Sequence, residues 1–325
     1  MSLALAAAIY AAAALCLCGF AWRVWGWADT PEPFRIPTTT GQQRSLDWIS
    51  PSRVESPSTR LGVAGRMALE ALLFRSLFRN TAHASVPCAS PYPHPVFLER
   101  KALWLGAMAL HWSLAVIGVR HLRLFVDPVP GAVAALSALD GFFEIGMPRW
   151  YATDAIVAAA LLYLLGRRLR DPLLRYLTLP ADYLALAALA AVVGTGIALR
   201  YASRVDLVDV RAFALGLAAF APAPLRAANL WLAAHLASAA VLLAALPFTK
   251  MVHAAGLWLS PTRNQANDSR RRRHVNPWNP PVPVRGYGAW RDEFRDKLAV
   301  AGLPIDETPE GGAPPGQARR GAAET

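Results

Sequence analysis

Four histidines lie within apolar segments of the sequence, where ionisable side chains are rare. His111 and His121 share one segment, and His235 and His253 share another. An ionisable residue inside a membrane span is costly and is by default a functional candidate. Histidine is also a usual axial ligand of non-covalently held haem iron, and facing helices are a usual place for such ligands. Two helices with two histidines each are therefore able to hold two haems, one above the other.

The spacing of the histidines permits two haems without demanding them. His111 and His121 are ten positions apart, which is about 15 Å along a straight helix. His235 and His253 are eighteen positions apart, which is about 27 Å. At about 100° per residue, the second pair returns to one helix face, whereas the first pair sits about 80° apart. Because the two spacings differ, tilt or a kink must absorb a difference in height of about 6 Å between the two histidines at each haem. Histidines that bond neighbouring helices or sit at membrane interfaces are the alternative.

Cationic side chains beside these histidines suit the carboxylates of haem. Arg120 and Arg123 flank His121, and Lys250 lies one turn before His253. Propionates need cationic partners, so these three side chains are candidates, with snorkelling to the interface as the alternative.

The elements that must position these residues are membrane helices. Of the 325 residues, 54% are hydrophobic and 17% are charged, with a formal net charge of +11. Soluble domains carry about a quarter charged residues, and a disordered chain is less apolar. The excess arginine lies in loops between apolar runs, which argues against nucleic-acid binding. Three cysteines, with no Cys-x-x-Cys-His sequence, exclude a disulfide scaffold, a self-contained four-cysteine iron–sulfur cluster and a covalently attached c-type haem.

Five apolar runs predict an all-α membrane protein with five transmembrane helices. The runs cover residues 2–22, 102–126, 150–166, 180–199 and 227–259. The first is followed by Arg23 and has no basic residue before it, unlike a secretory signal peptide, so a retained helix is expected. The last run is longer than a hydrocarbon core of about 30 Å requires, so it is expected to tilt or protrude and to kink at Pro247.

Basic residues orient these helices. Dense basic clusters fall in the first and third connections and the tail: Arg75 and Arg79, Arg100 and Lys101, Arg167, Arg168, Arg170 and Arg175, and residues 270–273. The positive-inside rule then places the N-terminus outside and the C-terminus in the cytoplasm, although four arginines in the second outer loop, Arg200, Arg204, Arg211 and Arg226, weaken the asymmetry. This orientation pairs His111 with His253 toward the inner face, and His121 with His235 toward the outer face.

The chain divides into five regions. Residues 1–26 form the first transmembrane helix, 27–101 a cytoplasmic loop with an amphipathic helix, 102–260 a four-helix haem-binding membrane region, 261–305 a cytoplasmic tail for partner docking, and 306–325 a disordered end. The amphipathic run 61–80 either lies on the membrane, docks a partner or caps the bundle as a surface helix.

Several strings carry a resemblance to a known family. They are PFRIPTT at 33–39, GQQ at 41–43, GRMALE at 65–70, FRSLFRN at 74–80, HWS at 111–113, RHLR at 120–123, LDGFF at 139–143, GTGI at 194–197, PF at 247–248, LSPTRN at 259–264 and HVNPWN at 274–279. With the histidine spacings, the sequence resembles the gamma subunit of respiratory nitrate reductase, a dihaem cytochrome b that oxidises quinol. The resemblance is closer to the membrane cytochromes of the complex associated with dissimilatory sulfite reductase, and it covers residues 1–304.

The resemblance implies two haem b groups, ligated by the pairs His111/His253 and His121/His235, and quinone or quinol as substrate. It implies electron transfer to a cytoplasmic iron–sulfur subunit resembling heterodisulfide reductase. Further implied partners are another membrane subunit, a periplasmic iron–sulfur protein and a multihaem cytochrome c. The related nitrate reductase subunit has a lysine near its quinone site, which this sequence lacks. Arg149, Asp140 and Glu144 are candidates to replace it, and the catalytic residues stay open.

The resulting prediction is a quinone-interacting dihaem cytochrome b subunit of dissimilatory sulfur metabolism, in the inner membrane of a bacterium. It would be an electron-transfer subunit of a quinone oxidoreductase, and the direction of electron flow is open. One rival is a haem-free membrane anchor for a cytoplasmic redox enzyme. Another is a dihaem cytochrome b of a different respiratory oxidoreductase. A third is a transporter with a histidine and arginine proton relay, which would show inverted repeats or broken helices; the sequence indicates neither.

Overall fold

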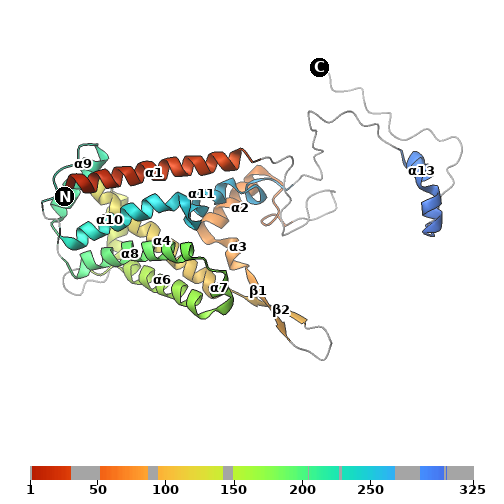
Figure 1. Cartoon of the computed structure of the whole chain (residues 1–325), viewed down its shortest axis with the longest axis horizontal. Helices are drawn as coiled ribbons and strands as arrows, with labels where there is room; N and C mark the ends of the chain where they lie inside the picture. The colour runs from red at the N-terminus through yellow and green to blue at the C-terminus, as the bar shows by residue number, and fades with distance from the viewer. Residues whose placement is uncertain are drawn as a thin grey trace, which may run out of the picture. The chain divides into compact units, whose positions relative to one another are not determined.

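The computed structural model describes residues 2–30, 52–86, 94–141, 149–203, 205–226, 229–267, 286–303 and 305. The chain divides into two compact units, Met1–Arg273 and His274–Thr325. The first contains the helix bundle of Figure 1, and the second contains helix α13, Tyr287–Val300. Some predictions fall outside the described residues: the strings at 33–39, 41–43 and 274–279, the basic run 270–273, the disordered end, Glu144 and Arg204.

Five long helices alternate in direction through the bundle: α1 (Ser2–Ala28), α4 (Lys101–Phe125), α6 (Ala152–Arg170), α8 (Pro180–Tyr201) and α10 (Leu230–Ala245). Four segments are long and apolar enough to cross a membrane, namely α1, α4, α8 and Leu230–Phe248. Helix α6 corresponds to the third predicted span. Its ends carry more charge, with Asp154 in the first turn and three arginines in the last.

The helices pack as neighbours in a chain of contacts. Helix α4 packs on α6, α6 on α8, α8 on α10, and α10 on α1. Leu110 and Val157 belong to one buried cluster, between α4 and α6. Ala6, Phe213 and Leu232 belong to another. The bundle therefore has two small apolar cores.

Short helices cover both ends of the bundle. Helices α5 (Gly131–Asp140) and α9 (Leu207–Ala218) lie at the end that holds the start of α1, called the α9 end below. Helices α2 (Arg60–Leu73), α3 (Arg75–Phe78) and α7 (Pro172–Leu177) lie at the opposite end, called the α2 end. Helices α5 and α9 lie in the connections between the predicted spans, where the apolar runs predict no helix.

The fifth predicted span is broken rather than kinked. Helix α10 ends at Ala245 and is followed by two 3-10 turns, Leu246–Phe248 and Lys250–Val252, before α11 (His253–Leu259) begins. Pro247 thus interrupts the helix instead of only bending it, because the proline cannot continue the helical hydrogen bonds. Among the functions considered from the sequence, a broken helix is a feature expected of a transporter. Both histidines of this span lie in its helical parts, one on each side of the break.

Helix α1 holds the break in place. A Cβ atom on Gly19 would lie 2.6 Å from the ring of Pro247, so only glycine allows this approach. The Nε atom of Arg23 donates to the carbonyl of Pro247 at 3.1 Å. This bond serves a carbonyl that the interrupted helix leaves without its usual partner.

The predicted amphipathic run 61–80 forms two helices instead of one. They are separated at Phe74, whose φ of 49° is left-handed. A two-stranded antiparallel hairpin follows, β1 (Thr81–Val86) with β2 (His94–Glu99), and it projects from the α2 end. This hairpin departs from the all-α prediction, in which residues 27–101 form a loop with one amphipathic helix.

Candidate functional site

The four histidines meet in two pairs at different levels of the bundle. His111 of α4 faces His253 at the start of α11, with ring centroids 5.9 Å apart. His121 of α4 faces His235 of α10, with centroids 6.4 Å apart. These pairings are the ones that the orientation argument predicts. The unequal spacings of ten and eighteen residues are accommodated across the break that separates His235 from His253.

Each imidazole places its Nδ1 atom on a hydrogen-bond acceptor. In three of them the acceptor is a main-chain oxygen three or four residues earlier: Ala107 for His111 at 2.8 Å, Ile117 for His121 at 2.7 Å and Lys250 for His253 at 2.7 Å. A carbonyl accepts only from a protonated nitrogen, so the Nδ1–H tautomer is assigned to these rings. The Nε2 lone pair is then available to a metal ion.

His235 is oriented by the neighbouring helix α8. Its Nδ1 atom lies 3.2 Å from the carbonyl oxygen of Val192 and 3.1 Å from the hydroxyl of Thr195. Gly196 lies against the same ring, because a Cβ atom there would stand 3.2 Å from Cε1 of His235. Helix α8 therefore fixes both the tautomer and the position of this imidazole.

Each pair fits a metal ion that brings its own equatorial ligands. With metal–nitrogen bonds of about 2 Å and each centroid about 1 Å behind its nitrogen, trans imidazoles have centroids about 6 Å apart. No group of three or more His, Cys, Asp or Glu side chains in the described ranges is able to hold a metal by itself. Two nitrogens from facing helices therefore suit a haem iron better than a structural metal ion.

The spacing of the helices agrees with that fit. Among the described helices, α4 and α10 are not a closely packed pair, unlike α4 with α6 or α10 with α8. The side chains of His111 and His121 are exposed although each faces another helix. The bundle thus separates the two histidine-bearing helices where a flat ring would have to lie.

Arg120 lies in a buried polar cluster formed with α5 and α6. Its Nη1 atom donates to Asp140 at 2.5 Å and to Thr153 at 3.1 Å, and lies 3.5 Å from Asp154. Its guanidinium group stacks 3.3 Å from the ring centroid of Tyr151. A propionate role for Arg120 would require it to leave these partners.

The other two predicted propionate partners differ from each other. Lys250 donates to Asp182 of α8 at 2.8 Å. Arg123 is half-exposed and makes no hydrogen bond or ion pair with any residue of the described ranges. Of the three predicted partners, Arg123 is therefore the one that lacks a carboxylate partner within the described ranges.

Two of the candidates for the quinone site lie close together, because the side chain of Arg149 lies against Gly141, the residue that follows Asp140. Asp140 accepts hydrogen bonds within the Arg120 cluster. The carbonyl of Arg149 accepts from Arg200 at 3.2 Å. Tyr201 donates to Asp154 at 2.9 Å, which adds a hydroxyl to the cluster that sequence reasoning missed. These residues lie far apart in sequence and carry no shared motif, so only the folded helices bring them together.

The turn at Phe74 lies against one member of the His111/His253 pair. The rings of Phe74 and His111 meet edge to face, with centroids 4.9 Å apart. The indole nitrogens of α4 donate to the last carbonyls of α2, Trp104 to Leu73 at 2.8 Å and Trp112 to Leu72 at 3.0 Å. The end of α2 is thereby fixed directly beside His111.

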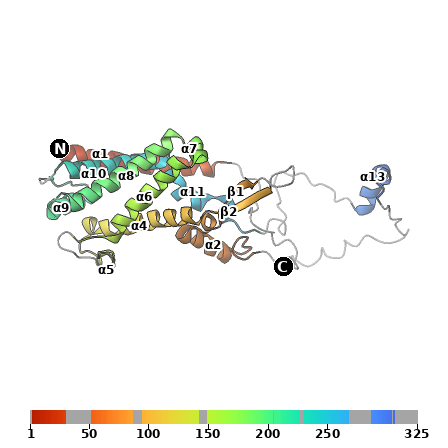
Figure 2. The same cartoon turned by 90° about the horizontal axis from the view of Figure 1, so that it is seen from below.

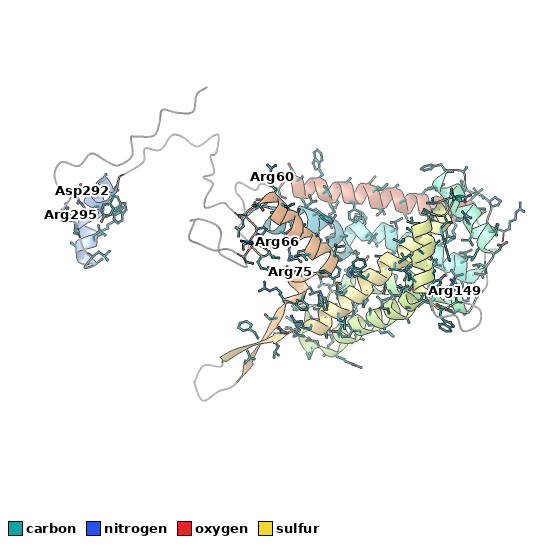
Figure 3. All side chains as sticks on the ribbon, turned by 180° about the vertical axis from the view of Figure 1, so that it is seen from behind. Arg60, Arg66, Arg75, Arg149, Asp292 and Arg295 are labelled. Atoms are coloured by element: carbon teal, nitrogen blue, oxygen red, sulfur yellow. The ribbon has the colours of Figure 1, made fainter. Side chains whose placement is uncertain are left out.

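Charged residues tie α2 and α3 to the rest of the α2 end. Buried Glu70 lies 2.9 Å from Arg263, which belongs to α12 (Pro261–Asn264). Glu55 accepts from Arg75 at 2.8 Å and pairs with Arg79 at 2.6 Å. Burial raises the pKa of Glu55, but the hydrogen bonds from Arg79 and Arg75 outweigh it and leave this pKa below the ordinary 4.5. Figure 3 shows Arg60, Arg66 and Arg75 at this end and Arg149 at the other.

Helix α2 buries two charged residues together with Val63 and Met67. Arg66 and Glu70 are buried, whereas Leu61 is 84% exposed and Leu72 is 52% exposed. An open groove of about 440 Å³ runs along this outward face; its lining includes Gly62, Gly65, Ala68, Leu69 and Leu72. The surface of α2 beside His111 is therefore apolar.

The fold and site define a class: a helix bundle with membrane-length apolar helices and two histidine pairs suited to iron at two levels. Residues 94–265, which include all four histidines, match the family model of the nitrate reductase gamma subunit. The chain belongs to this family.

Two curated relatives cover most of the chain. The Hdr-like menaquinol oxidoreductase cytochrome b-like subunit of Archaeoglobus profundus is 38% identical over 303 residues, 90% of this chain and 86% of the relative. The protein of the same name from Archaeoglobus fulgidus is 38% identical over 293 residues, 86% of this chain and 84% of the relative.

Proposed function

We propose that this chain is a dihaem cytochrome b subunit that carries electrons between a quinone pool and a cytoplasmic partner. The observation that carries the proposal is the two histidine pairs, in which every Nδ1 atom has an acceptor. His111 and His253 would ligate one haem b, and His121 and His235 the other. Bound haem would supply a one-electron couple at each level. The protein would supply the imidazole ligands, their orientation and burial, which set the potentials.

The proposed orientation puts the N-terminus outside, the C-terminus in the cytoplasm and five spans between them, with α6 as the third. Support comes from the α2 end, where Lys101, Arg167, Arg168, Arg170 and Lys250 gather with the arginines of α2 and α3. This end would face the cytoplasm by the positive-inside rule. The inner pair is then His111/His253. The membrane is the cytoplasmic membrane.

Quinol or quinone is the proposed substrate, at the outer end of the bundle. The names of the relatives support menaquinol as its form. Quinol oxidation needs groups that accept and release protons. The Arg120 cluster provides two carboxylates, Asp140 and Asp154, hydrogen-bonded to Thr153 and Tyr201 beside the outer pair. We assign proton handling to this cluster.

The outward face of α2 is the proposed docking site for the electron partner. It is apolar, contains the groove of α2 and ends at Phe74, which contacts His111. Arg53 lines the groove and Arg60 is exposed near it, so a partner surface with an apolar centre and an acidic rim would be complementary. The Hdr-like name of the relatives supports a cytoplasmic iron–sulfur subunit resembling heterodisulfide reductase.

The wider assignment rests on the sequence resemblance. It places the chain in the complex associated with dissimilatory sulfite reductase and thus in sulfur metabolism. The remaining proposed partners are a second membrane subunit, a periplasmic iron–sulfur protein and a multihaem cytochrome c.

A reduced-minus-oxidised visible spectrum of the purified complex, with haem counted per chain as the pyridine haemochrome, tests the proposal. Two b haems per chain are expected. A haem-free chain, from cells that load another cytochrome b, would leave the membrane-anchor function. One haem per chain would show that one histidine pair has another role.

A further inference from the structure

The residue that accepts from His253 is itself held from another helix. Lys250 offers its carbonyl oxygen to Nδ1 of His253 at 2.7 Å, and its Nζ atom lies 2.8 Å from the carboxylate of Asp182 on α8. One residue thus connects the inner histidine to α8 through its main chain and its side chain together.

The burial of Asp182 favours its pairing with Lys250. Its side chain is 5% exposed, whereas that of Lys250 is 71% exposed. It also accepts from the main-chain nitrogen of Leu179 at 3.1 Å, as part of the cap of α8. A buried carboxylate that lost its cation would be strongly destabilised. The ammonium group of the exposed Lys250 side chain is therefore held at the buried carboxylate of Asp182.

This link matters because the helix that carries His253 is interrupted. Thr249 is extended, with φ −115° and ψ 176°, so the hydrogen bonds of α10 do not continue to Lys250. The turn Lys250–Val252 instead packs against α8. Its position, and hence the direction of the His253 imidazole, depends on contacts from other helices. Among the described contacts between this turn and other helices, the Lys250–Asp182 pair is the one formed by two charged groups.

We propose that Asp182 is a positioning residue for His253 and acts through Lys250. The proposal rests on the assignment of His253 as an inner haem ligand. Asp182 does not touch the haem; it fixes the carbonyl that orients the ligand. Binding of a haem propionate by Lys250 is the competing explanation of any effect of this lysine.

Redox titration and electron paramagnetic resonance of the haem-loaded complex test this proposal. Asp182→Asn keeps the shape of the cap and removes the charge. Lys250→Gln removes the other charge, and Lys250→Arg keeps it. Asp171→Asn is the matched control, because Asp171 also caps a helix at the α2 end, bonding Leu173 and Leu174, and pairs with Arg100 at 3.8 Å.

The proposal expects a change confined to the inner haem. Asp182→Asn should raise its potential, because an uncompensated lysine disfavours the ferric state, and Lys250→Gln should lower it. Both should shift its low-spin resonance, which reports ligand orientation. Lys250→Arg should restore the resonance. The outer haem should not change in any variant, nor either haem in Asp171→Asn.

Two results would overturn the proposal. The first is an inner haem whose potential and resonance are the same in Asp182→Asn as in Asp171→Asn, but are changed in Lys250→Gln. Lys250 would then act on this haem without Asp182. The second is a wild-type resonance in Lys250→Gln, which decides the matter even where Asp182→Asn folds poorly. A wild-type complex without haem would instead remove the proposed function on which the inference rests.

Discussion

Gly196 of α8 and His235 of α10 are in direct contact, and a methyl group on the glycine would stand 3.2 Å from Cε1 of the imidazole. That distance is shorter than ordinary van der Waals contact. The Nδ1 partners of His235 also come from α8, so one helix both bonds this ring and limits the space beside it. The position of His235 is therefore sensitive to a single methyl group.

Gly196→Ala should displace His235 by a few tenths of an ångström and shift the resonance of the outer haem. Gly194→Ala is the control on the same helix, since a Cβ atom there meets nothing within 4 Å. Both changes favour the helix by about 1 kcal/mol, so a difference between them reports the ring contact. Identical spectra for the two variants would contradict the prediction.

Alanine substitutions should remove haem by pairs. His111→Ala and His253→Ala should lose the same inner haem, and His121→Ala and His235→Ala the same outer haem, because each iron needs both of its imidazoles. The pyridine haemochrome should fall from two haems to about one per chain. His94→Ala, in the hairpin, is the control and should keep both. A variant that retains two haems would exclude that histidine as a ligand.

Arg120→Gln should destabilise the bundle by about 3–5 kcal/mol, because it leaves buried Asp140 without its cation. The relevant side chains are 7% and 4% exposed, so water does little to screen them. The midpoint of thermal unfolding in detergent measures the effect. Arg123→Gln is the control, because Arg123 lacks an ion pair in the described ranges. Equal midpoints for the two variants would refute the prediction.

Acid should loosen the attachment of α3. The folded pKa of Glu55 lies below the ordinary 4.5, so its contribution is present above that pH and is lost as the pH falls through the folded value. Glu55→Gln should reproduce this loss at neutral pH, seen as faster tryptic cleavage after Arg75 and Arg79. Glu99→Gln, a 69% exposed carboxylate 3.6 Å from Lys101, is the control. Unchanged cleavage in Glu55→Gln would show that the pairs do not hold α3.

A charge on the outward face of α2 should prevent partner binding without loss of haem. Leu72→Glu places a carboxylate in the groove that the partner is proposed to fill. The measurement is co-purification of the iron–sulfur subunit alongside the haem count. Phe97→Glu, on the hairpin and 70% exposed, is the control. Retention of the partner by Leu72→Glu would place the docking site elsewhere.

The histidine pairs were predictable because each is set by two simple quantities, the direction of a helix and the depth of a residue along it. The distances of 5.9 and 6.4 Å agree with that argument for all four residues. The break at Pro247 was predictable only as a kink. Its full form depends on Gly19 and Arg23, whose contact with Pro247 no local pattern reveals.

The partners of charged residues were not predictable. Arg120 is next to His121 in sequence, yet its side chain bonds Asp140 and Thr153 from other helices. The amphipathic pattern of α2 was visible, but it does not say which face points inward. In this chain the inward face is mixed: Val63 and Met67 are buried beside Arg66 and Glu70, and Glu70 pairs with Arg263 there.

The contact of Gly19 and Arg23 with Pro247 joins two helical segments that are made more than 200 residues apart. His253 follows this contact, so the proposed His253 ligand reaches its final position only when both segments are present. A signal peptidase that removed α1, or a tag that disturbed its insertion, should leave a chain that takes up the outer haem and fails at the inner one. The first helix would then be a part of cofactor assembly as well as a membrane anchor.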